Sequence, residues 1–460
     1  MDREELGIVF DHAARFLRSL PERPVRPEAA VAELRTELGL PLQPESIPAA
    51  DVIRDLIAAA EPGLMGTTSP RFFGFVIGGT TPVALAADWL TTLWDQNAGL
   101  YASAPAASVA EETAARWLVD VLGLPPGTST GFVTGGQMAN FTCLAAARDH
   151  VLAEAGWDVE RDGLQGAPRI RVIAGEERHS TIDRALRYLG LGETTARLVP
   201  ADEQGRMRPD ALEETLVEED APTIVCAQAG NVNSGSFDPL RPICEMSRQA
   251  GAWVHVDGAF GLWAAASPRL AHLLDGHDLA DSWATDGHKW LNVPYDSGFA
   301  FCARPEAHRR AMQVHASYLI HAEDAERDPM DWNPEFSRRA RGFAVYAAMR
   351  ALGRGGITEM IERGCDNARR FADRLATADG VEVLNEVVLN QVLVAFGDDE
   401  RTQEVVRRVQ ADGTCWLSGS RWRGRAVMRI SVSNWATTAD DVDRSVGAIL
   451  AAAEAAQRLS

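Results

Sequence analysis

The sequence predicts an α/β fold: a mostly parallel sheet covered by helices on both faces, followed by a smaller α+β region. Two observations support this. Between about residues 130 and 303, short apolar runs rich in β-branched residues alternate with segments of helical apolar spacing. From about residue 311, a long helical stretch instead precedes strand candidates and a closing helix. The 460 residues are enough for more than one domain.

The first part of the chain predicts an arm of helices and loops. Residues 11–20 have helical apolar spacing, Pro21, Pro24 and Pro27 interrupt it, and residues 31–38 resume it. We therefore expect residues 1–80 to form an N-terminal helical arm.

The central part predicts strands that alternate with helices, and we expect residues 81–310 to form the large domain. Helices are expected at 138–155, 182–189 and 242–250. The apolar runs that predict strands are 131–134, 170–174, 223–227, 253–256 and 297–301, with a further short run before Lys289.

The last part predicts a smaller α+β domain, residues 311–460. A long helix is expected at 343–376 and a closing helix at 439–459. Strand candidates lie between them, at 381–396 and 427–432.

Composition excludes several classes of partner. The formal net charge of −20 opposes binding to nucleic acid or to an anionic membrane. The six cysteines are scattered without CxxC or metal-ligand spacing, so we expect no metal site and buried, reduced thiols. No basic n-region with an apolar run opens the chain, and no uncharged stretch approaches the roughly 20 residues that span a bilayer. A cytoplasmic protein is expected.

Lysine usage points to one position. Among 45 basic residues only Lys289 is a lysine. Arginine keeps its proton near neutral pH, whereas a lysine with a lowered pKa can form a Schiff base with a carbonyl. The alternative is a chance survivor of an arginine-rich composition, but the surrounding run 282–292 changes from apolar to small and polar residues and then reaches a His-Lys pair.

Four features follow strand candidates, and the carboxyl ends of parallel strands are where ligands bind in such sheets. They are the Gly-Gly turn within 134–140, His179, Asp257 and Lys289. The first three also have a plainer interpretation: the glycines could form a simple turn, and His179 and Asp257 could each cap a helix. A carboxylate that ends a buried strand needs a cation or fixed donors, however. Together the four supply what pyridoxal phosphate needs: an amine, a carboxylate for the ring nitrogen, a phosphate cradle and an imidazole.

Several runs of sequence then resemble a known family, the group II pyridoxal-phosphate-dependent amino acid decarboxylases, which include the aromatic-L-amino-acid and glutamate enzymes. The resemblance extends from about residue 60 to the C-terminus. It implies the fold type I architecture, an obligate homodimer with active sites at the subunit interface, and an arm that wraps the partner. The runs that carry it are 69–75, 179–185, 235–239, 254–260, 286–298 and 428–434.

The resemblance also implies roles for individual residues. Lys289 would form the Schiff base, Asp257 would hold the pyridine nitrogen, and His179 would stack on the ring. Loss of carbon dioxide leaves a carbanion whose charge the protonated ring accepts, and His179 would be placed for proton transfer. The remaining assignments are contacts to the cofactor or the substrate: Gly136 and Gln137 to the phosphate, Ala259 to the ring, His288 to the phosphate or Schiff-base region, and Arg429 near the substrate.

Aromatic residues suggest the substrate. Phe72, Phe73, Phe75, Trp94 and Tyr101 lie where the family builds part of its pocket, which favours an aromatic or bulky apolar amino acid. The alternative is that these side chains are core.

One stretch departs from the family. Its members carry a tyrosine on a mobile loop that reprotonates Cα, but residues 320–334 contain none, and Pro329 falls near the expected position. His321 or Tyr318 could supply the proton; otherwise oxygen could compete, which would make the chain an aldehyde synthase. An aminotransferase or an aldol-type lyase would use the same lysine and aspartate, and a non-catalytic cofactor-binding scaffold would keep the same fold.

Overall fold

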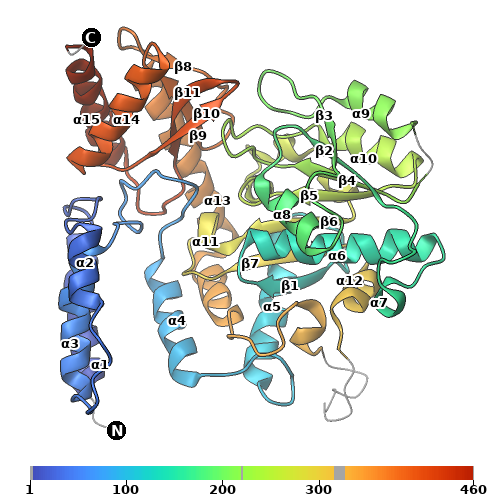
Figure 1. Ribbon diagram of the computed structural model, residues 1–460, viewed down its shortest axis with the longest axis horizontal. Helices are drawn as coiled ribbons and strands as arrows, with labels where there is room; N and C mark the ends of the chain where they lie inside the picture. The colour runs from blue at the N-terminus through green and yellow to red at the C-terminus, as the bar shows by residue number, and fades with distance from the viewer. Residues whose placement is uncertain (1–3, 219–220, 315–326, 459–460) are drawn as a thin grey trace.

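A seven-stranded sheet forms the centre of the larger part of the computed structural model, which describes residues 4–218, 221–314 and 327–458 (Figure 1). The run β6-β5-β4-β2-β3 is parallel, whereas β7 pairs antiparallel with both β1 and β6. The predicted mostly parallel α/β sheet is therefore confirmed. In sheet order the strands are β1 Ser129–Val133, β7 Gly298–Cys302, β6 Ser282–Asp286, β5 Trp253–Asp257, β4 Thr223–Gln228, β2 Arg171–Gly175 and β3 Arg197–Val199.

Helices cover both faces of this sheet, as its uninterrupted apolar strands require. In β2, Ile173 packs into one apolar cluster, whereas Val172 and Ala174 pack into another. The cluster of Val172 and Ala174 includes residues of α6 (Gly136–Glu154), α8 (Ser180–Tyr188) and α12 (Pro305–Met312). The cluster of Ile173 includes residues of α5 (Pro105–Val121), α9 (Pro209–Leu216), α10 (Leu240–Gln249) and α13 (Gly342–Leu375).

A four-stranded antiparallel sheet forms the smaller part, in the order β10-β11-β9-β8. Its strands are β10 Ser418–Trp422, β11 Arg425–Ser431, β9 Gln391–Ala395 and β8 Glu382–Val383, and α14 (Asp399–Asp412) and α15 (Ala439–Gln457) share its apolar core. The helix expected at 343–376 is interrupted at Gly353, whose φ of 60° favours glycine. The boundaries proposed at residues 80 and 310 stay predictions.

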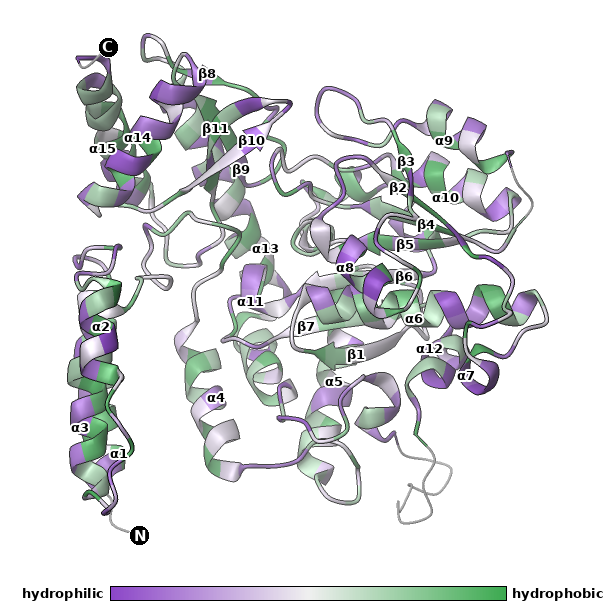
Figure 2. Cartoon of the chain, viewed as in Figure 1, coloured by the Kyte–Doolittle hydropathy of each residue, from purple (hydrophilic) through white to green (hydrophobic). Residues whose placement is uncertain are grey.

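The N-terminal arm lies to one side of both sheets (Figure 1). It comprises α1 (Glu4–Ser19), α2 (Val31–Leu38) and α3 (Ala49–Ala60), and α4 (Pro82–Trp94) follows it toward the sheet. Neither α1 nor α2 has a buried residue, although both carry apolar side chains (Figure 2).

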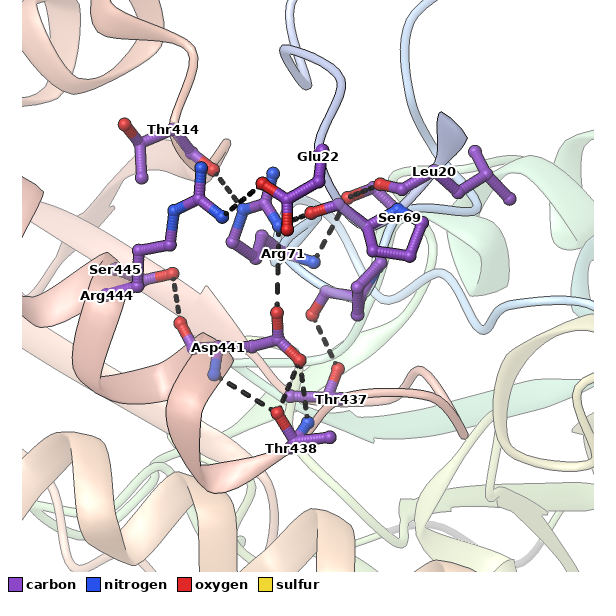
Figure 3. A network of polar contacts seen from close by, with 12 residues as sticks. Leu20, Glu22, Ser69, Arg71, Thr414, Thr437, Thr438, Asp441, Arg444 and Ser445 are labelled. Carbon is purple, nitrogen blue, oxygen red and sulfur yellow. Dashed lines mark hydrogen bonds and ion pairs between the residues drawn. The ribbon is translucent and has the colours of Figure 1, made fainter. Parts of the chain in front are cut away.

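Arg71 joins this arm to the smaller part (Figure 3). Its buried guanidinium donates to the carbonyls of Pro21 and Arg23 at the end of α1 and to that of Thr414, and it lies 3.7 Å from the Asp441 carboxylate on α15. Because one side chain satisfies backbone groups from both regions, it fixes where the arm leaves the body of the molecule.

Two further expectations concern the chain as a whole. All six cysteines are free and buried. In the part of the chain that the structure describes, every helix is too short or too polar to span a bilayer.

Candidate active site

The predicted strand-end groups line one cavity. It lies where β4, β5 and β6 end and where α6 and α8 begin, and its wall includes Gly136, His179, Asp257 and Lys289. Gln137 and Ala259, also predicted to bind the cofactor, line the same cavity. Parallel strands bring their carboxyl ends to one edge, so residues far apart in the sequence meet there.

Asp257 closes β5 and is 4% exposed. Its carboxylate accepts hydrogen bonds from the Asn140 side-chain amide at 3.1 Å and from the backbone N–H of Ala259 at 3.2 Å, and the Thr181 hydroxyl is at 3.5 Å. The sequence left two kinds of partner open for this buried carboxylate, a cation or fixed donors. Within the described residues, its hydrogen-bond partners are fixed donors. They hold it in one orientation toward the cavity.

Asn140 and His255 support Asp257 from behind. The Asn140 Oδ1 lies 2.9 Å from His255 Nε2, and His255 Nδ1 lies 3.0 Å from the Ser282 hydroxyl. Burial lowers the pKa of His255 to about 4, so its ring is neutral near pH 7. Because Asn140 donates to Asp257, its Oδ1 accepts from His255, and the direction of the chain is set. Neither Asn140 nor His255 was predicted as a site residue.

His179 both caps a helix and lines the cavity. Its Nδ1 accepts from the Thr181 backbone N–H at 3.3 Å, which makes it the N-cap of α8, and lies 2.9 Å from the Thr181 hydroxyl. Burial lowers the pKa of His179, against the opposing charge of Asp257. The capping interpretation is thus correct without excluding the stacking role, which stays a prediction.

Lys289 lies on α11 (Gly287–Trp290), the single helical turn after β6. Its Nζ is 2.8 Å from the Asp286 carboxylate and 6.0 Å from the centroid of the Phe260 ring. The side chain is 21% exposed, so it reaches the cavity from a buried base.

The glycine turn and Asp286 lie together. Asp286, 2% exposed, accepts from the backbone N–H of Gly136, and a Cβ on Gly136 would come within 2.8 Å of its carboxylate. The predicted contact residue His288 lies beside the turn: a Cβ on Gly135 would be 3.1 Å from its ring. The His288 ring stacks on Tyr295 at 4.1 Å, burial lowers its pKa, and its buried Nδ1 has no hydrogen-bond partner in the described residues.

These residues fit pyridoxal phosphate. The turn leaves backbone donors at the N-terminus of α6, where side chains larger than glycine would not fit. An orphaned imidazole nitrogen stands next to it, and an amine and a carboxylate reach the same cavity.

Arg429 lies on β11, close to this cavity. It donates to the carbonyl of Val232, which lines the cavity, at 3.2 Å and to that of Phe75 at 3.5 Å. Burial lowers the pKa of Arg429 to about 10, and its positive charge contributes to the lowered pKa of His179.

Among the described residues, those that line this cavity do not include the predicted aromatic substrate residues Phe72, Phe73, Trp94 and Tyr101. Phe73 packs edge-on against Phe371 in the core of the smaller part, and Phe72 stacks on Trp416. Both are buried, as the alternative that they belong to the core expects, and their assignment to the substrate stays a prediction.

Trp94 and Tyr101 remain open as substrate residues. Trp94 is 47% exposed at the end of α4 and contacts Phe343 edge-on. Tyr101 is half-buried, and its backbone N–H donates to Asp328. The loop candidates Tyr318 and His321 lie outside the described residues, whereas Pro329 begins a 3₁₀ turn, Pro329–Trp332.

Comparison with known proteins identifies the family. Residues 32–397 match the family described as "Pyridoxal-dependent decarboxylase conserved domain". The chain belongs to this family. Its members' chemistry makes it a pyridoxal-phosphate-dependent amino acid decarboxylase, and this favours decarboxylation over the aminotransferase, aldol-type lyase and scaffold alternatives.

Two proteins similar to this chain have different named activities. Tryptophan decarboxylase 1 of Oryza sativa subsp. japonica is 28% identical over 466 residues, covering 94% of this chain and 90% of that protein. 4-Hydroxyphenylacetaldehyde synthase of Rhodiola rosea is 28% identical over 452 residues, covering 91% and 89%.

Solved structures confirm the fold of the decarboxylase. The crystal structure of Oryza sativa TDC with PLP and tryptamine has a TM-score of 0.92 at 24% identity, covering 98% of this chain and 97% of that one. Mouse CSAD has a TM-score of 0.89 at 24% identity, with the same coverage. The fold type I architecture expected from the sequence is thereby confirmed.

Proposed function

We propose that the chain decarboxylates an aromatic L-amino acid, with Lys289 as the residue that binds the cofactor covalently. The observation that carries this proposal is the meeting of the chain's only lysine with Asp257, His179 and the Gly136 turn in one cavity. When bound, pyridoxal phosphate supplies the carbonyl that takes up the substrate amine and the ring that accepts charge as carbon dioxide leaves.

Asp257 and His179 are held for different tasks. The donors around the Asp257 carboxylate keep it fixed, so it can hold a proton at the ring nitrogen. The cap engages Nδ1 of His179, which fixes the plane of the imidazole and leaves Nε2 to exchange a proton with the substrate.

The names of the relatives support an aromatic substrate. They include Tryptophan decarboxylase 1 and, at 27% identity over 401 residues, an Aromatic-L-amino-acid decarboxylase of Bacillus atrophaeus. In this chain, Phe260 lies beside Lys289, and the exposed aromatic side chains Phe75 and Trp94 are available to a pocket completed by a second subunit.

A homodimer is part of the proposal. The arm and α4 expose apolar side chains, among them Leu6, Phe10, Leu17, Trp89 and Leu93. Large apolar side chains exposed together on neighbouring helices favour an interface. The net charge of −20 and the free, buried thiols support a cytoplasmic enzyme without a nucleic-acid partner.

The experiment that tests the function is a profile of the twenty amino acids, with amine, aldehyde and carbon dioxide measured for each. Aromatic amino acids are expected to release equal amounts of carbon dioxide and organic product. Borohydride reduction should fix the cofactor at Lys289 alone. Keto acid without carbon dioxide, or cofactor fixed in no peptide, contradicts the proposal.

A second candidate, an aldehyde synthase, is favoured by one observation: residues 320–334 lack the family's tyrosine. The relatives include 4-hydroxyphenylacetaldehyde synthase of Rhodiola rosea and Phenylacetaldehyde synthase of Petunia hybrida. If His321 supplies the proton to Cα, His321→Phe shifts the product from amine to aldehyde and peroxide, whereas the matched variant Tyr318→Phe does not. An unchanged amine yield in His321→Phe removes His321 from the mechanism.

A further inference from the structure

Asp286 is the buried carboxylate at the centre of the phosphate end of the site. It closes β6, and all five residues of that strand are buried. Its side chain is 2.8 Å from Lys289 Nζ, accepts from the Gly136 backbone N–H, and lies 3.5 Å from His288 Nε2. Other charged or titratable groups that act on this region are His179 on α8 and Tyr295 after α11.

Two acceptors could bind the Gly136 N–H: the cofactor phosphate and the Asp286 carboxylate. It stands in the first turn of α6, whose positive dipole end and free backbone donors suit the cofactor phosphate. In this structure the Asp286 carboxylate takes that donor. A phosphate dianion and a carboxylate that both lie close to this N–H repel each other. Burial strengthens the repulsion because it removes the water that would screen the two charges.

We propose that Asp286 is a positioning residue that competes with the cofactor phosphate for the N-terminus of α6. Before loading, it holds the Gly136 donor and keeps Lys289 ion-paired. On loading, the phosphate displaces it from Gly136. The inference rests on the assignment of Lys289 and Gly136 in the proposed function, and it makes the affinity for phosphate depend on the charge of Asp286.

Asp286→Asn is the informative variant. The amide has the size of the carboxylate and still offers an oxygen to the Gly136 N–H, but it carries no charge and its NH₂ can donate to phosphate. The dissociation constants of pyridoxal phosphate and of pyridoxal are measured on cofactor-free protein by tryptophan fluorescence. Pyridoxal has the same ring and aldehyde without the phosphate.

The ratio of the two constants isolates the phosphate. Loss of the Asp286 charge also changes Lys289, but that effect is shared by both ligands and cancels in the ratio. We expect Asp286→Asn to bind pyridoxal phosphate about tenfold more tightly and to leave pyridoxal within about twofold. Asp275→Asn, an exposed carboxylate paired with Arg241 on the surface, removes the same charge and should change neither constant.

The following outcomes would contradict the proposal or the proposed function. Unchanged or weaker binding of pyridoxal phosphate in Asp286→Asn overturns the competition, and so does an equal gain for both ligands. If circular dichroism shows that Asp286→Asn does not fold, Asp286→Ser is used instead. Inorganic phosphate is then titrated as a competitor against pyridoxal phosphate in the wild type and in Asp286→Ser. Stronger competition in the variant is expected, and equal competition overturns the proposal. A wild type that binds no pyridoxal phosphate defeats the proposed function instead.

Discussion

The large sheet and the N-terminal arm treat their apolar residues in opposite ways. Every residue of β5 and β6 is buried, and Asp257 and Lys289, the residues proposed to bind the cofactor, stand at or just after their ends. In α1 and α2 no residue is buried, and Leu6 and Phe10 are 62% and 64% exposed. A single chain therefore completes the core around the cofactor site but not the arm. The difference supports the proposal that the arm packs against a second copy of the chain.

A cavity between the arm and the body strengthens this comparison. Apolar side chains line it from both sides: Phe16, Leu17 and Leu20 from the arm, and Leu85, Trp89 and Trp435 from the body. Because this apolar surface is open to solvent, we expect a second copy of the chain to cover it.

The largest effect is expected on the sheet side. Lys289→Ala should lower turnover by more than about 10⁴-fold and abolish the visible absorbance of bound cofactor, because no other lysine can replace it. The dimer, measured by light scattering, should persist. Lys289→Arg keeps the charge beside Asp286 and should be equally inactive; appreciable turnover in either variant removes Lys289 from catalysis.

Asp257→Ala comes next. Turnover should fall on the order of a thousandfold, because the charge that holds the ring nitrogen is lost. Asn140→Ala removes only one donor to Asp257 and should have a smaller effect in the same direction. Steady-state kinetics measure both, and a near wild-type rate in Asp257→Ala would show that another group holds the ring.

The arm is tested by a double variant, Leu6→Ser with Phe10→Ser. If these side chains are buried in a dimer, its dissociation constant should rise by at least about a hundredfold, since each buried side chain contributes about 1.5–3 kcal/mol. Analytical ultracentrifugation measures the change. Val217→Ser, at an apolar residue outside the arm that is 82% exposed, is the control. An unchanged dimer would place the interface elsewhere.

The smallest effect concerns acid. Burial lowers the pKa of His255 to about 4, whereas an unfolded histidine titrates near 6.5. Between these values the unfolded chain binds a proton that the folded chain does not, so the free energy of unfolding falls as the pH falls. Because of His255, the free energy of unfolding should fall by on the order of 1 kcal/mol per pH unit between about pH 6.5 and about 4.

His255→Gln removes this titration and should flatten the pH dependence of denaturant unfolding relative to the wild type. The exposed His272→Gln should leave the dependence as it is. Equal slopes in the wild type and His255→Gln would contradict the assignment. His308, whose pKa burial lowers to about 3, should retain its own contribution in both variants.

The sequence predicted most of this sheet and the main groups of the site, because strand ends in a parallel sheet converge whatever the details of packing. It missed β3, where Arg197 and Leu198 are exposed and the apolar run is too short to recognise. It also missed Asn140, since only the fold brings α6 over β5. Asp286 carried the same signal as Asp257, a carboxylate that closes a buried strand, and could have been found.

The role of Phe72 and Phe73 is ambiguous in the sequence for another reason. The run Phe72-Phe73 is compatible with a pocket and with a core, and nothing local distinguishes them. In the structure Phe73 contacts Phe371 and Phe72 contacts Trp416, and both of these partners are distant in sequence. Trp94, which is exposed in the single chain, stays a prediction as a substrate residue.

The solitary lysine has a practical consequence for how this enzyme is handled. Lys289 is largely buried and, in the proposed function, its nitrogen is bound to the cofactor in the loaded enzyme. Lysine-directed reagents such as glutaraldehyde or succinimidyl esters then find no side-chain amine on the whole surface. After treatment with such a reagent, a dimer of this protein would still migrate as a monomer on a denaturing gel. Its assembly therefore has to be determined from its mass in solution.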